Sequence, residues 1–356
     1  MQCAYLVFRP ESLTYTVCRA LSECGHRVSV WVADPEFGRR AETSIHRRVA
    51  DIDGVDIAGR DAARLPAAVD RLIVQAFPRP ADVMREWPSL GPRARAVTLI
   101  SAGDRSRSWR EAARLQWLEA RRIGRGWGRV DRVLYKDGFH RVDLFSLLRP
   151  RDVVGFDVHS QFLSQAVERA AMHAVDWTPD AVRHWLVNFL GSRDPQERLR
   201  VLDEIRHRFV SPQGEPVSPR PGKRMFWCEY SDAAPGGLPP ARFVETLTQS
   251  DFTLCPRGYS LVTHRPLEAL LRGSVPVLCA DELGLYGIDL VDGKTCIAVG
   301  DGGWTAALDR IAALADDEIV AMRRHVLAMR PSLDYANLAR GICRRLGVAT
   351  PAGARR

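Results

Sequence analysis

An arginine and a glutamate, Arg265 and Glu268, stand three positions apart in the stretch SDFTLCPRGYSLVTHRPLEALLRGSVPVL, residues 250–278. A guanidinium can hold phosphate oxygens through two parallel hydrogen bonds, and an ionised carboxylate accepts hydrogen bonds from sugar hydroxyls. The pair therefore suits a ligand that carries both groups, such as a nucleotide sugar. An ordinary strand–helix–strand unit with an acid in the first turn of its helix explains the same residues equally well.

The elements around this pair place it at the start of a helix. The apolar run 251–255 predicts a buried strand, and Gly258 in the following break can take a positive φ or let a ligand approach the backbone. A helix is expected from Arg265 to Gly273, which suits a left-handed helix end, and residues 275–278 predict the next strand. Free N–H groups and a partial positive charge at the helix start favour phosphate.

Length and composition set the frame. The 356 residues include 46% hydrophobic and 26% charged residues, as in soluble globular proteins, and the length predicts two domains. No apolar run is long enough to span a bilayer, and the start, MQCAYLVFRPESL, has no basic leader followed by an apolar core. The eight cysteines form no CxxC pair, so neither a zinc ribbon nor a redox motif is indicated. A reducing cytoplasm is the expected location.

The net charge of +8 favours phosphate-bearing or acidic partners, or peripheral contact with an anionic membrane surface. The glycine-rich residues 124–128 could contact an anionic acceptor or a lipid headgroup, and we favour a solvated turn. Nucleic acid is not expected, because no basic helix with interleaved aromatics is found. Asp51 and Asp53 have the spacing of a metal-binding DxD motif, but no strong strand precedes them and a turn explains them better. No metal or cofactor is expected.

Strands and helices alternate along the whole chain, which implies parallel, doubly wound sheets of the α/β class. Strands are predicted at 4–8, 27–34, 70–77, 96–103, 129–138, 152–156, 184–193, 225–230, 251–255, 275–278 and 295–299. Helices are predicted around Val17 and Leu21, ending at Gly25, and at 81–87, 108–122, 161–175, 194–209, 241–249, 304–314 and 332–346. We expect a first domain at 1–150, a second at 151–335, and a C-terminal helix with a frayed tail at 336–356. Ligands of such sheets bind beyond the carboxyl ends of the strands.

The stretch 250–277 resembles the exostosin-type glycosyltransferases. That family reads roughly Ser-x-Phe-Cys-Leu-x-Pro-x-Gly, then Ser-x-Arg-x-x-Glu-Ala-Leu, then Gly-Cys-x-Pro-Val. The matching residues are Ser250, Phe252, Leu254, Pro256, Gly258, Arg265, Glu268, Ala269, Leu270, Gly273, Pro276 and Val277. The sequence departs at Thr253, Thr263 and Ser274, and Thr263 keeps the hydroxyl. Weaker similarity lies in LVNFLGSR with the later Arg198 and in RDVVGFD; the first half, with ALSECGHRVSVWVAD, is similar only at the level of fold.

The resemblance implies a GT-B fold, in which two Rossmann-like domains face each other across a cleft. It implies a nucleotide-sugar donor on the second domain and a glycan, lipid-linked or small-molecule acceptor on the first. The implied reaction is an inverting transfer of a hexosyl or related sugar to a hydroxyl without a metal. By the same resemblance Arg265 binds the diphosphate and Glu268 the ribose, and Thr263, Gly258, Tyr259 and Ser260 line the phosphate site. Arg193 is added because it ends a predicted strand.

An inverting displacement needs a base that takes the proton of the acceptor hydroxyl. The sequence does not single it out. The candidates are Glu11, Asp104, Asp137, His140, Asp157 and His159. We favour Asp104 and Asp137, because each follows a well-formed strand.

Two other functions stay open. A sugar-nucleotide epimerase on the same fold would turn over the donor without an acceptor. A non-enzymatic basic protein that binds nucleic acid or anionic surfaces would show steeply salt-dependent binding and no affinity for nucleoside diphosphates.

Overall fold

The structure is a computed structural model, which describes residues 1–10, 12–37, 49–61, 64–75, 80–101, 117, 121, 130–135, 153–155, 177–193, 196–209, 224–230, 239–258, 263, 265–286, 288–333 and 335–349. The chain forms two compact units, Met1–Gln161 together with Tyr335–Arg356, and Phe162–Asp334. The boundary expected near residue 150 and the helix expected at 161–175 lie outside the described residues, as does most of the helix expected at 108–122. The predicted domain limits therefore stay predictions.

Seven parallel strands form the sheet of the first unit, in the order β3-β2-β1-β4-β5-β6-β7. Their bounds are β1 Gln2–Val7, β2 Arg27–Val32, β3 Val55–Gly59, β4 Val69–Gln75, β5 Ala94–Ser101, β6 Val130–Tyr135 and β7 Val153–Gly155. The strands β1 and β2 are mostly apolar, and β1, β2 and β4 are largely buried, as is typical of parallel sheets that helices cover on both faces. The helix α1 (Ser12–Glu23) connects β1 to β2, whereas α3 (Pro80–Arg85), α4 (Trp87–Leu90) and the 3₁₀ helix η2 (Gly91–Arg93) follow β4.

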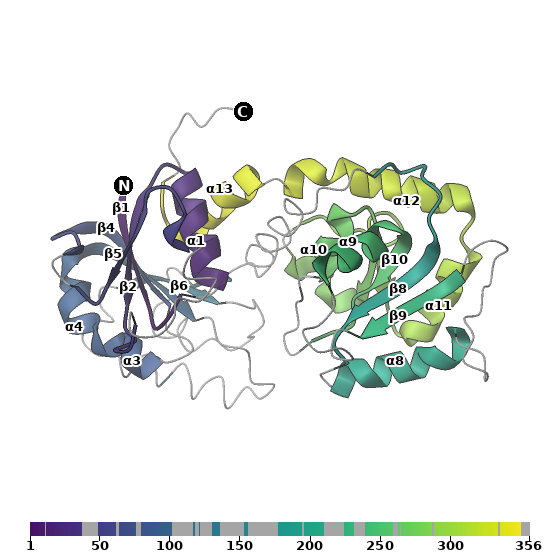
Figure 1. The fold of residues 1–356 in the computed structure, drawn as a ribbon, viewed down its shortest axis with the longest axis horizontal. Helices are drawn as coiled ribbons and strands as arrows, with labels where there is room; N and C mark the ends of the chain where they lie inside the picture. The colour runs from purple at the N-terminus through teal and green to yellow at the C-terminus, as the bar shows by residue number, and fades with distance from the viewer. Residues whose placement is uncertain are drawn as a thin grey trace. The chain divides into compact units, whose positions relative to one another are not determined.

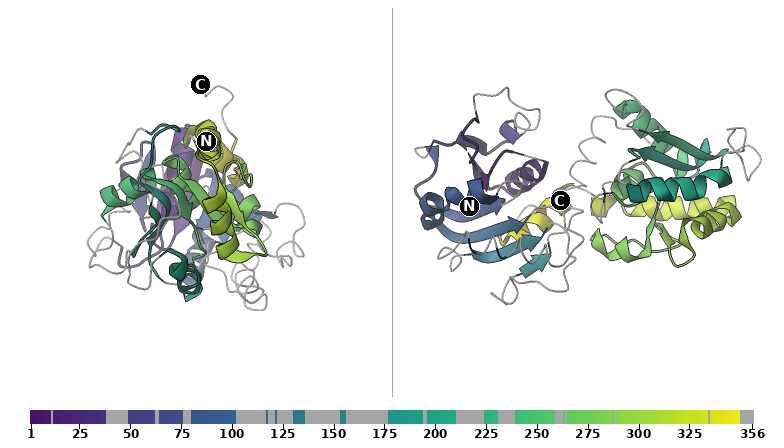
Figure 2. Two further views of the ribbon diagram at one scale, coloured as in Figure 1. Left: turned by 90° about the vertical axis from the view of Figure 1, so that its right-hand side faces the viewer. Right: turned by 90° about the horizontal axis from the view of Figure 1, so that it is seen from below.

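The last helix of the chain, α13 (Tyr335–Leu346), belongs to the first unit. It packs along α1 (Figure 1), and it also contacts β6. In the right-hand view of Figure 2, its yellow ribbon lies beside the blue strands of the first sheet. Its buried side chains Ala339, Ile342, Cys343 and Leu346 recur at helical spacing. Burial of this apolar face fixes the C-terminal helix on the N-terminal part of the chain.

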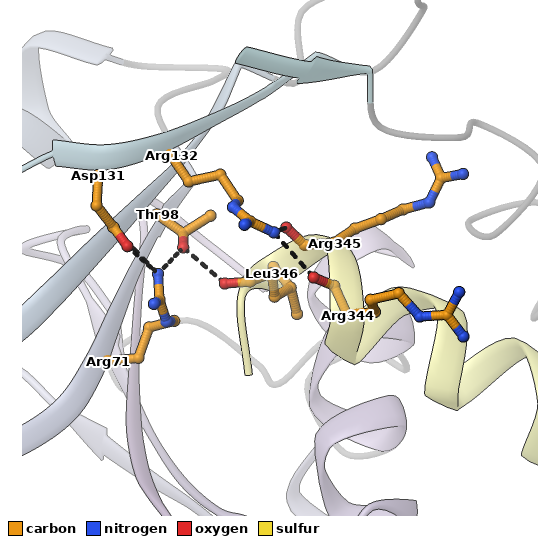
Figure 3. A network of polar contacts seen from close by, with 7 residues as sticks. All are labelled: Arg71, Thr98, Asp131, Arg132, Arg344, Arg345 and Leu346. Carbon is orange, nitrogen blue, oxygen red and sulfur yellow. Dashed lines mark hydrogen bonds and ion pairs between the residues drawn. The ribbon is translucent and has the colours of Figure 1, made fainter. Parts of the chain in front are cut away.

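Polar side chains of the first sheet hold the C-terminal end of α13 (Figure 3). The Nη1 atom of Arg132 donates to the main-chain oxygens of Arg344 and Arg345, at 2.8 and 2.6 Å. The hydroxyl of Thr98 donates to the main-chain oxygen of Leu346 at 2.9 Å. The last carbonyls of a helix have no partner within the helix, and a cation next to them complements the helix dipole. These bonds therefore close the end of α13 against the sheet.

Five parallel strands form the sheet of the second unit, in the order β12-β11-β10-β8-β9. Their bounds are β8 Trp185–Gly191, β9 Arg224–Tyr230, β10 Ser250–Leu254, β11 Val275–Cys279 and β12 Ile297–Val299. The helices are α8 Gln196–Phe209, α9 Pro240–Thr248, α10 Arg265–Leu271, α11 Gly303–Ala313 and α12 Asp316–Ala328, with the 3₁₀ helices η4 Ala280–Leu285 and η5 Arg330–Leu333. The helices α8 and α11 pack against each other, and so do α9 and α10 (Figure 1).

The two parallel sheets confirm the predicted doubly wound α/β class, and strands occur at every position where one was expected. Gly273 ends α10 with φ +69°, which confirms its role as a left-handed helix end. A Cβ at this glycine would lie 2.4 Å from Cε3 of Trp177, so the position also requires glycine for space. No helix in the described ranges has both the length and the apolar character that crossing a membrane demands.

Candidate functional site

The candidate site lies where three neighbouring strands of the second sheet end. The strands β8, β10 and β11 are adjacent and parallel, and they end at Gly191, Leu254 and Cys279. Ligands of open parallel sheets bind beyond this edge, because the loops there are free of the sheet's hydrogen bonding. The residues expected from the sequence to bind a nucleotide sugar follow β10 directly.

Arg265 is the first residue of α10 and is 8% exposed. Its guanidinium carbon lies over the ring of Phe189, 4.7 Å from the ring centroid. A Cβ at Gly191 would come within 2.1 Å of Nη2 and 3.0 Å of Cζ of this arginine. Only a glycine at the end of β8 leaves room for the guanidinium, and the φ of +148° at Gly191 also favours glycine. The structure thus brings a buried cation to the ligand edge of the sheet.

Glu268 follows three residues later on the same helix and is 5% exposed. Residues three apart lie on one face of a helix, so Glu268 shares the face of Arg265. The apolar neighbours Leu267 and Leu270 are fully buried in the core, which fixes the rotation of α10. The helix therefore presents a guanidinium and a carboxylate together, as the sequence predicted.

Arg198 of α8 joins the site from another element and is 9% exposed. Its Nη1 atom donates to the main-chain oxygen of Ser192 at 3.0 Å. A Cβ at Gly258 would lie 2.9 Å from Nη2 of Arg198 and 3.3 Å from Cγ2 of Thr263. The backbone at Gly258 thus passes close to a second arginine. From the sequence, Arg198 was part of a weak similarity only, and its position soon after the end of β8 is the signal that could have identified it.

The remaining predicted residues have different outcomes. Arg193 is described and exposed, two residues beyond Gly191, and its part in the site stays a prediction. Tyr259 and Ser260 lie outside the described residues. The preferred bases Asp104 and Asp137 lie outside them too, together with Glu11, His140, Asp157 and His159.

The loop after β10 is fixed by residues that follow β11. The Nε atom of Arg257 donates to Oε1 of Glu282 at 2.7 Å, and its Nη2 atom pairs with Asp281. The main-chain N–H of Thr263 donates to the hydroxyl of Tyr286 at 3.2 Å. Burial raises the pKa of Glu282 to about 7 although Arg257 acts to lower it. Glu282 is thus a buried carboxyl group that titrates near neutral pH.

Cys279, Asp281 and Glu282 have ligand atoms within 4.8 Å of one another, and no other such group was found among the described residues. Both carboxylates pair with Arg257, so a guanidinium supplies the positive charge that a metal ion would bring. Burial also raises the pKa of the Cys279 thiol to about 11, which keeps it protonated and a poor metal ligand at neutral pH. The donor set does not argue for a metal.

The first unit has a polar pocket of about 250 Å³ at the carboxyl ends of β1 and β2. It is lined by Phe8, Arg9, Asp34, Pro35, Glu36, Asp82 and Arg85. Asp34 is buried, forms an ion pair with Arg9 and accepts a hydrogen bond from the N–H of Glu36 at 3.1 Å. This pocket lies beyond the carboxyl ends of the strands, where ligands of parallel sheets bind.

No family model matches the sequence, and no curated protein matches it. Two solved structures share its fold over nearly the whole chain. HepE of Anabaena, in complex with UDP and glucose, is 10% identical over 98% of this chain and 99% of its own, with a TM-score of 0.52. Sucrose-phosphate synthase of Thermosynechococcus elongatus is 11% identical over 97% of this chain and 98% of its own, with a TM-score of 0.51. These similarities confirm the GT-B fold with its two Rossmann-like units.

Proposed function

We propose that the protein is an exostosin-like glycosyltransferase, which moves a hexosyl or related sugar from a nucleotide-sugar donor to a hydroxyl acceptor. One observation carries the proposal: the guanidinium of Arg265 lies at the ligand edge of the second sheet, in a space that exists because Gly191 has no side chain. The GT-B fold and the sequence pattern of residues 250–277 support it. The structures of HepE in complex with UDP and glucose and with UDP-glucose favour a uridine nucleotide as the first donor to test.

In this proposal the donor diphosphate lies between two arginines. Arg265 binds it directly, and Arg198 contributes a second positive charge next to Gly258. Glu268 accepts hydrogen bonds from the ribose hydroxyls. Thr263 and the backbone of residues 258–260 line the phosphate site, and Arg193 contacts the donor from the end of β8. Because α10 has only seven residues, the side-chain charges contribute more than the helix dipole.

The proposed chemistry is an inverting displacement without a metal. The acceptor oxygen attacks the anomeric carbon, the bond to the diphosphate breaks, and the acceptor proton passes to a base. Arg265 and Arg198 stabilise the charge that develops on the leaving diphosphate, as fixed cations in a buried site do. Asp104 and Asp137 remain the proposed bases. If the variants Asp104→Asn and Asp137→Asn both transferred sugar at the wild-type rate, neither would be the base.

The proposed acceptor is a glycan, a lipid-linked intermediate or a small molecule, and the polar pocket around Asp34 and Arg9 is the proposed place for its hydroxyl groups. We place the protein in the cytoplasm, in peripheral contact with anionic membrane where the acceptor is lipid-linked. The seven cysteines with described side chains are free thiols, which suits a reducing compartment.

A thermal-shift titration with UDP, GDP, dTDP, CDP and ADP tests the proposal. A ligand that binds the folded state alone raises the melting temperature with its concentration. We expect a shift with at least one diphosphate, UDP first, and its loss in Arg265→Ala. Arg310→Ala is the matched control, since this exposed arginine of the same unit pairs with Asp292 on the surface. The absence of any shift in the wild type would refute the proposal, and donor turnover without an acceptor would support an epimerase instead.

A further inference from the structure

Residues 280–286, which comprise η4 and Tyr286, contact both ends of the loop that carries the proposed donor site. We call them the anchor segment. This loop connects β10 to α10, and the structure describes its residues 256–258 and 263. Arg257 at its beginning and Thr263 at its end both bond to the anchor segment.

The first anchor is the ion pair between Arg257 and Glu282. The Nε atom of Arg257 lies 2.7 Å from Oε1 of Glu282, whose side chain is 2% exposed. Arg257 also pairs with Asp281, whose side chain is 63% exposed. Loss of one partner from a buried pair is costly, whereas an exposed ion pair contributes little. Of the two acids, Glu282 is therefore the one that holds Arg257 in place.

The second anchor is a hydrogen bond from the loop backbone to a buried phenol. The N–H of Thr263 lies 3.2 Å from the hydroxyl oxygen of Tyr286, which is fully buried. Thr263 stands two residues before Arg265, so this bond sets the path by which the chain enters α10. A phenylalanine at position 286 would fill the same space and remove only the acceptor.

The two ends of the loop also lie close to each other. A Cβ at Gly258 would be 3.3 Å from Cγ2 of Thr263, and 2.9 Å from Nη2 of Arg198. The residue after Arg257 thus lies against the residue that Tyr286 holds. A shift at either anchor would move the backbone at Gly258, which lies against Arg198, or at Thr263, which stands two residues before Arg265.

We propose that Glu282 and Tyr286 are positioning residues of the donor site, which hold Arg257 and Thr263 so that the neighbouring Gly258 and Arg265 lie where they bind the donor diphosphate. The inference rests on the proposed function. Neither side chain needs to touch the donor, because each acts through the loop residue that it holds. Their loss should raise the dissociation constant and the KM for the donor, with a smaller effect on kcat.

The charge of Glu282 makes this role dependent on pH. The groups that face its carboxyl group are Arg257 of the loop, Asp281 of the anchor segment, Cys279 of β11, Cys255 after β10 and Tyr286. Burial raises the pKa of Glu282 to about 7, so acid protonates it and weakens its bond to Arg257. Donor affinity should therefore fall as the pH decreases from 8 to 6.

The test uses the full-length protein and the nucleoside diphosphate that shifts its melting temperature most. Its dissociation constant is measured from pH 6 to 8.5 for Glu282→Gln, Tyr286→Phe and the matched control Asp281→Asn. We expect binding to weaken roughly tenfold in Glu282→Gln at pH 8, as for other misplaced binding groups, with less dependence on pH than in the wild type. Tyr286→Phe should weaken binding but keep the wild-type pH dependence, and Asp281→Asn should bind as the wild type does.

Wild-type affinity and pH dependence in both Glu282→Gln and Tyr286→Phe would overturn the inference, whereas failure of the wild type to bind any diphosphate would overturn the proposed function. If Glu282→Gln does not fold, Arg257→Gln removes the same ion pair by changing its partly exposed partner. Weaker binding in Arg257→Gln then supports the inference, and unchanged binding overturns it.

Discussion

Each unit of the protein buries an arginine against a glycine, and the two arrangements differ in what surrounds the guanidinium. In the first unit, a Cβ at Gly347 would lie 3.1 Å from Cζ of Arg71. The Nη1 atom of Arg71 bonds to Asp131 at 2.9 Å and to Thr98 at 2.8 Å (Figure 3). In the second unit, Arg265 lies against Gly191 and over an aromatic ring.

The position of each arginine in its sheet explains the difference. Arg71 lies near the amino end of β4, and the chain segment that it meets is the end of α13. A carboxylate and a hydroxyl from neighbouring strands bond to it, so it serves as a joint that holds the C-terminal helix. Arg265 lies beyond the carboxyl end of β8, where ligands of parallel sheets bind. A buried arginine thus serves the fold at one edge of a sheet and, as we propose, the ligand at the other.

Exchanging the two glycines for alanine gives the sharpest contrast. In Gly191→Ala the new Cβ would overlap Arg265, 2.1 Å from Nη2, and we expect nucleoside diphosphate binding to weaken roughly a hundredfold because the cation is displaced. In Gly347→Ala, at φ +72°, strain should lower the free energy of unfolding by about 1–3 kcal/mol and leave binding unchanged. Urea unfolding and nucleotide titration measure both quantities. Unchanged binding in Gly191→Ala would remove the distinction between the two arginines.

Removal of Arg71 should affect stability alone. Arg71→Ala leaves the carboxylate of Asp131, which is 38% exposed, without its partner and opens a space under α13. We expect a loss of about 2 kcal/mol in the free energy of unfolding, from the charged hydrogen bonds to Thr98 and Asp131. Asp131→Asn keeps the shape and should cost less. Nucleotide affinity should equal that of the wild type in both variants, and a parallel loss of affinity would show that the joint also shapes the donor site.

The pH dependence of stability should separate the two units as well. The pKa of Glu282 is about 7 in the folded protein and 4.5 ordinarily, so the folded state keeps a proton that the unfolded chain releases. Its contribution is fully present below pH 4.5 and is lost as the pH rises towards 7. Wild type should lose roughly 2 kcal/mol relative to Glu282→Gln between pH 5 and 8, and Arg71→Ala should keep this slope. Parallel curves for wild type and Glu282→Gln in urea unfolding would contradict this.

Stability and the proposed donor affinity then change in opposite directions with pH. Ionised Glu282 costs free energy because it is buried, and the same charge holds Arg257 in place. A protein selected for stability alone would place an apolar side chain there. The cost is consistent with a binding role for the loop.

Local sequence patterns predicted the sheets because buried parallel strands are often continuous apolar runs, as in β1 and β11. The edge strand β3 has the pattern VDIAG and is only partly buried, so no such run marks it. The helix α12 was not predicted, although its buried residues Ile319, Met322 and Val326 do recur at helical spacing. Its signal was present in the sequence and was missed.

The residues of the candidate site also fall into two groups, those that the local sequence predicts and those that it does not. Arg265, Glu268 and Gly258 lie in one stretch and could be predicted from it. Phe189, Gly191 and Arg198 come from an earlier part of the chain. The first two lie against Arg265 and Arg198 lies against Gly258, because β8 pairs with β10. Strand order is a property of the whole sheet that no local pattern specifies. Glu282 and Tyr286 depend likewise on the pairing of β10 with β11.

The smallest expected effect concerns the hydroxyl of Thr98, which links Arg71 to the C-terminal end of α13. It accepts a hydrogen bond from Arg71 and donates one to the main-chain oxygen of Leu346 (Figure 3). Thr98→Val keeps the shape and removes both bonds, and we expect a loss of about 1–2 kcal/mol in the free energy of unfolding. Thr98→Ser retains the hydroxyl and should lose less.

Hydrogen exchange of α13 tests whether this loss acts at the joint. The amides of α13 should exchange faster in Thr98→Val than in Thr98→Ser, because the end of the helix has lost the donor that closed it. Nucleotide binding should be the same in both variants, since Thr98 holds the end of α13 in the first unit and is not part of the proposed donor site. Equal exchange in the two variants would mean that Arg132, which also donates to the last carbonyls of α13, is sufficient to hold the helix end.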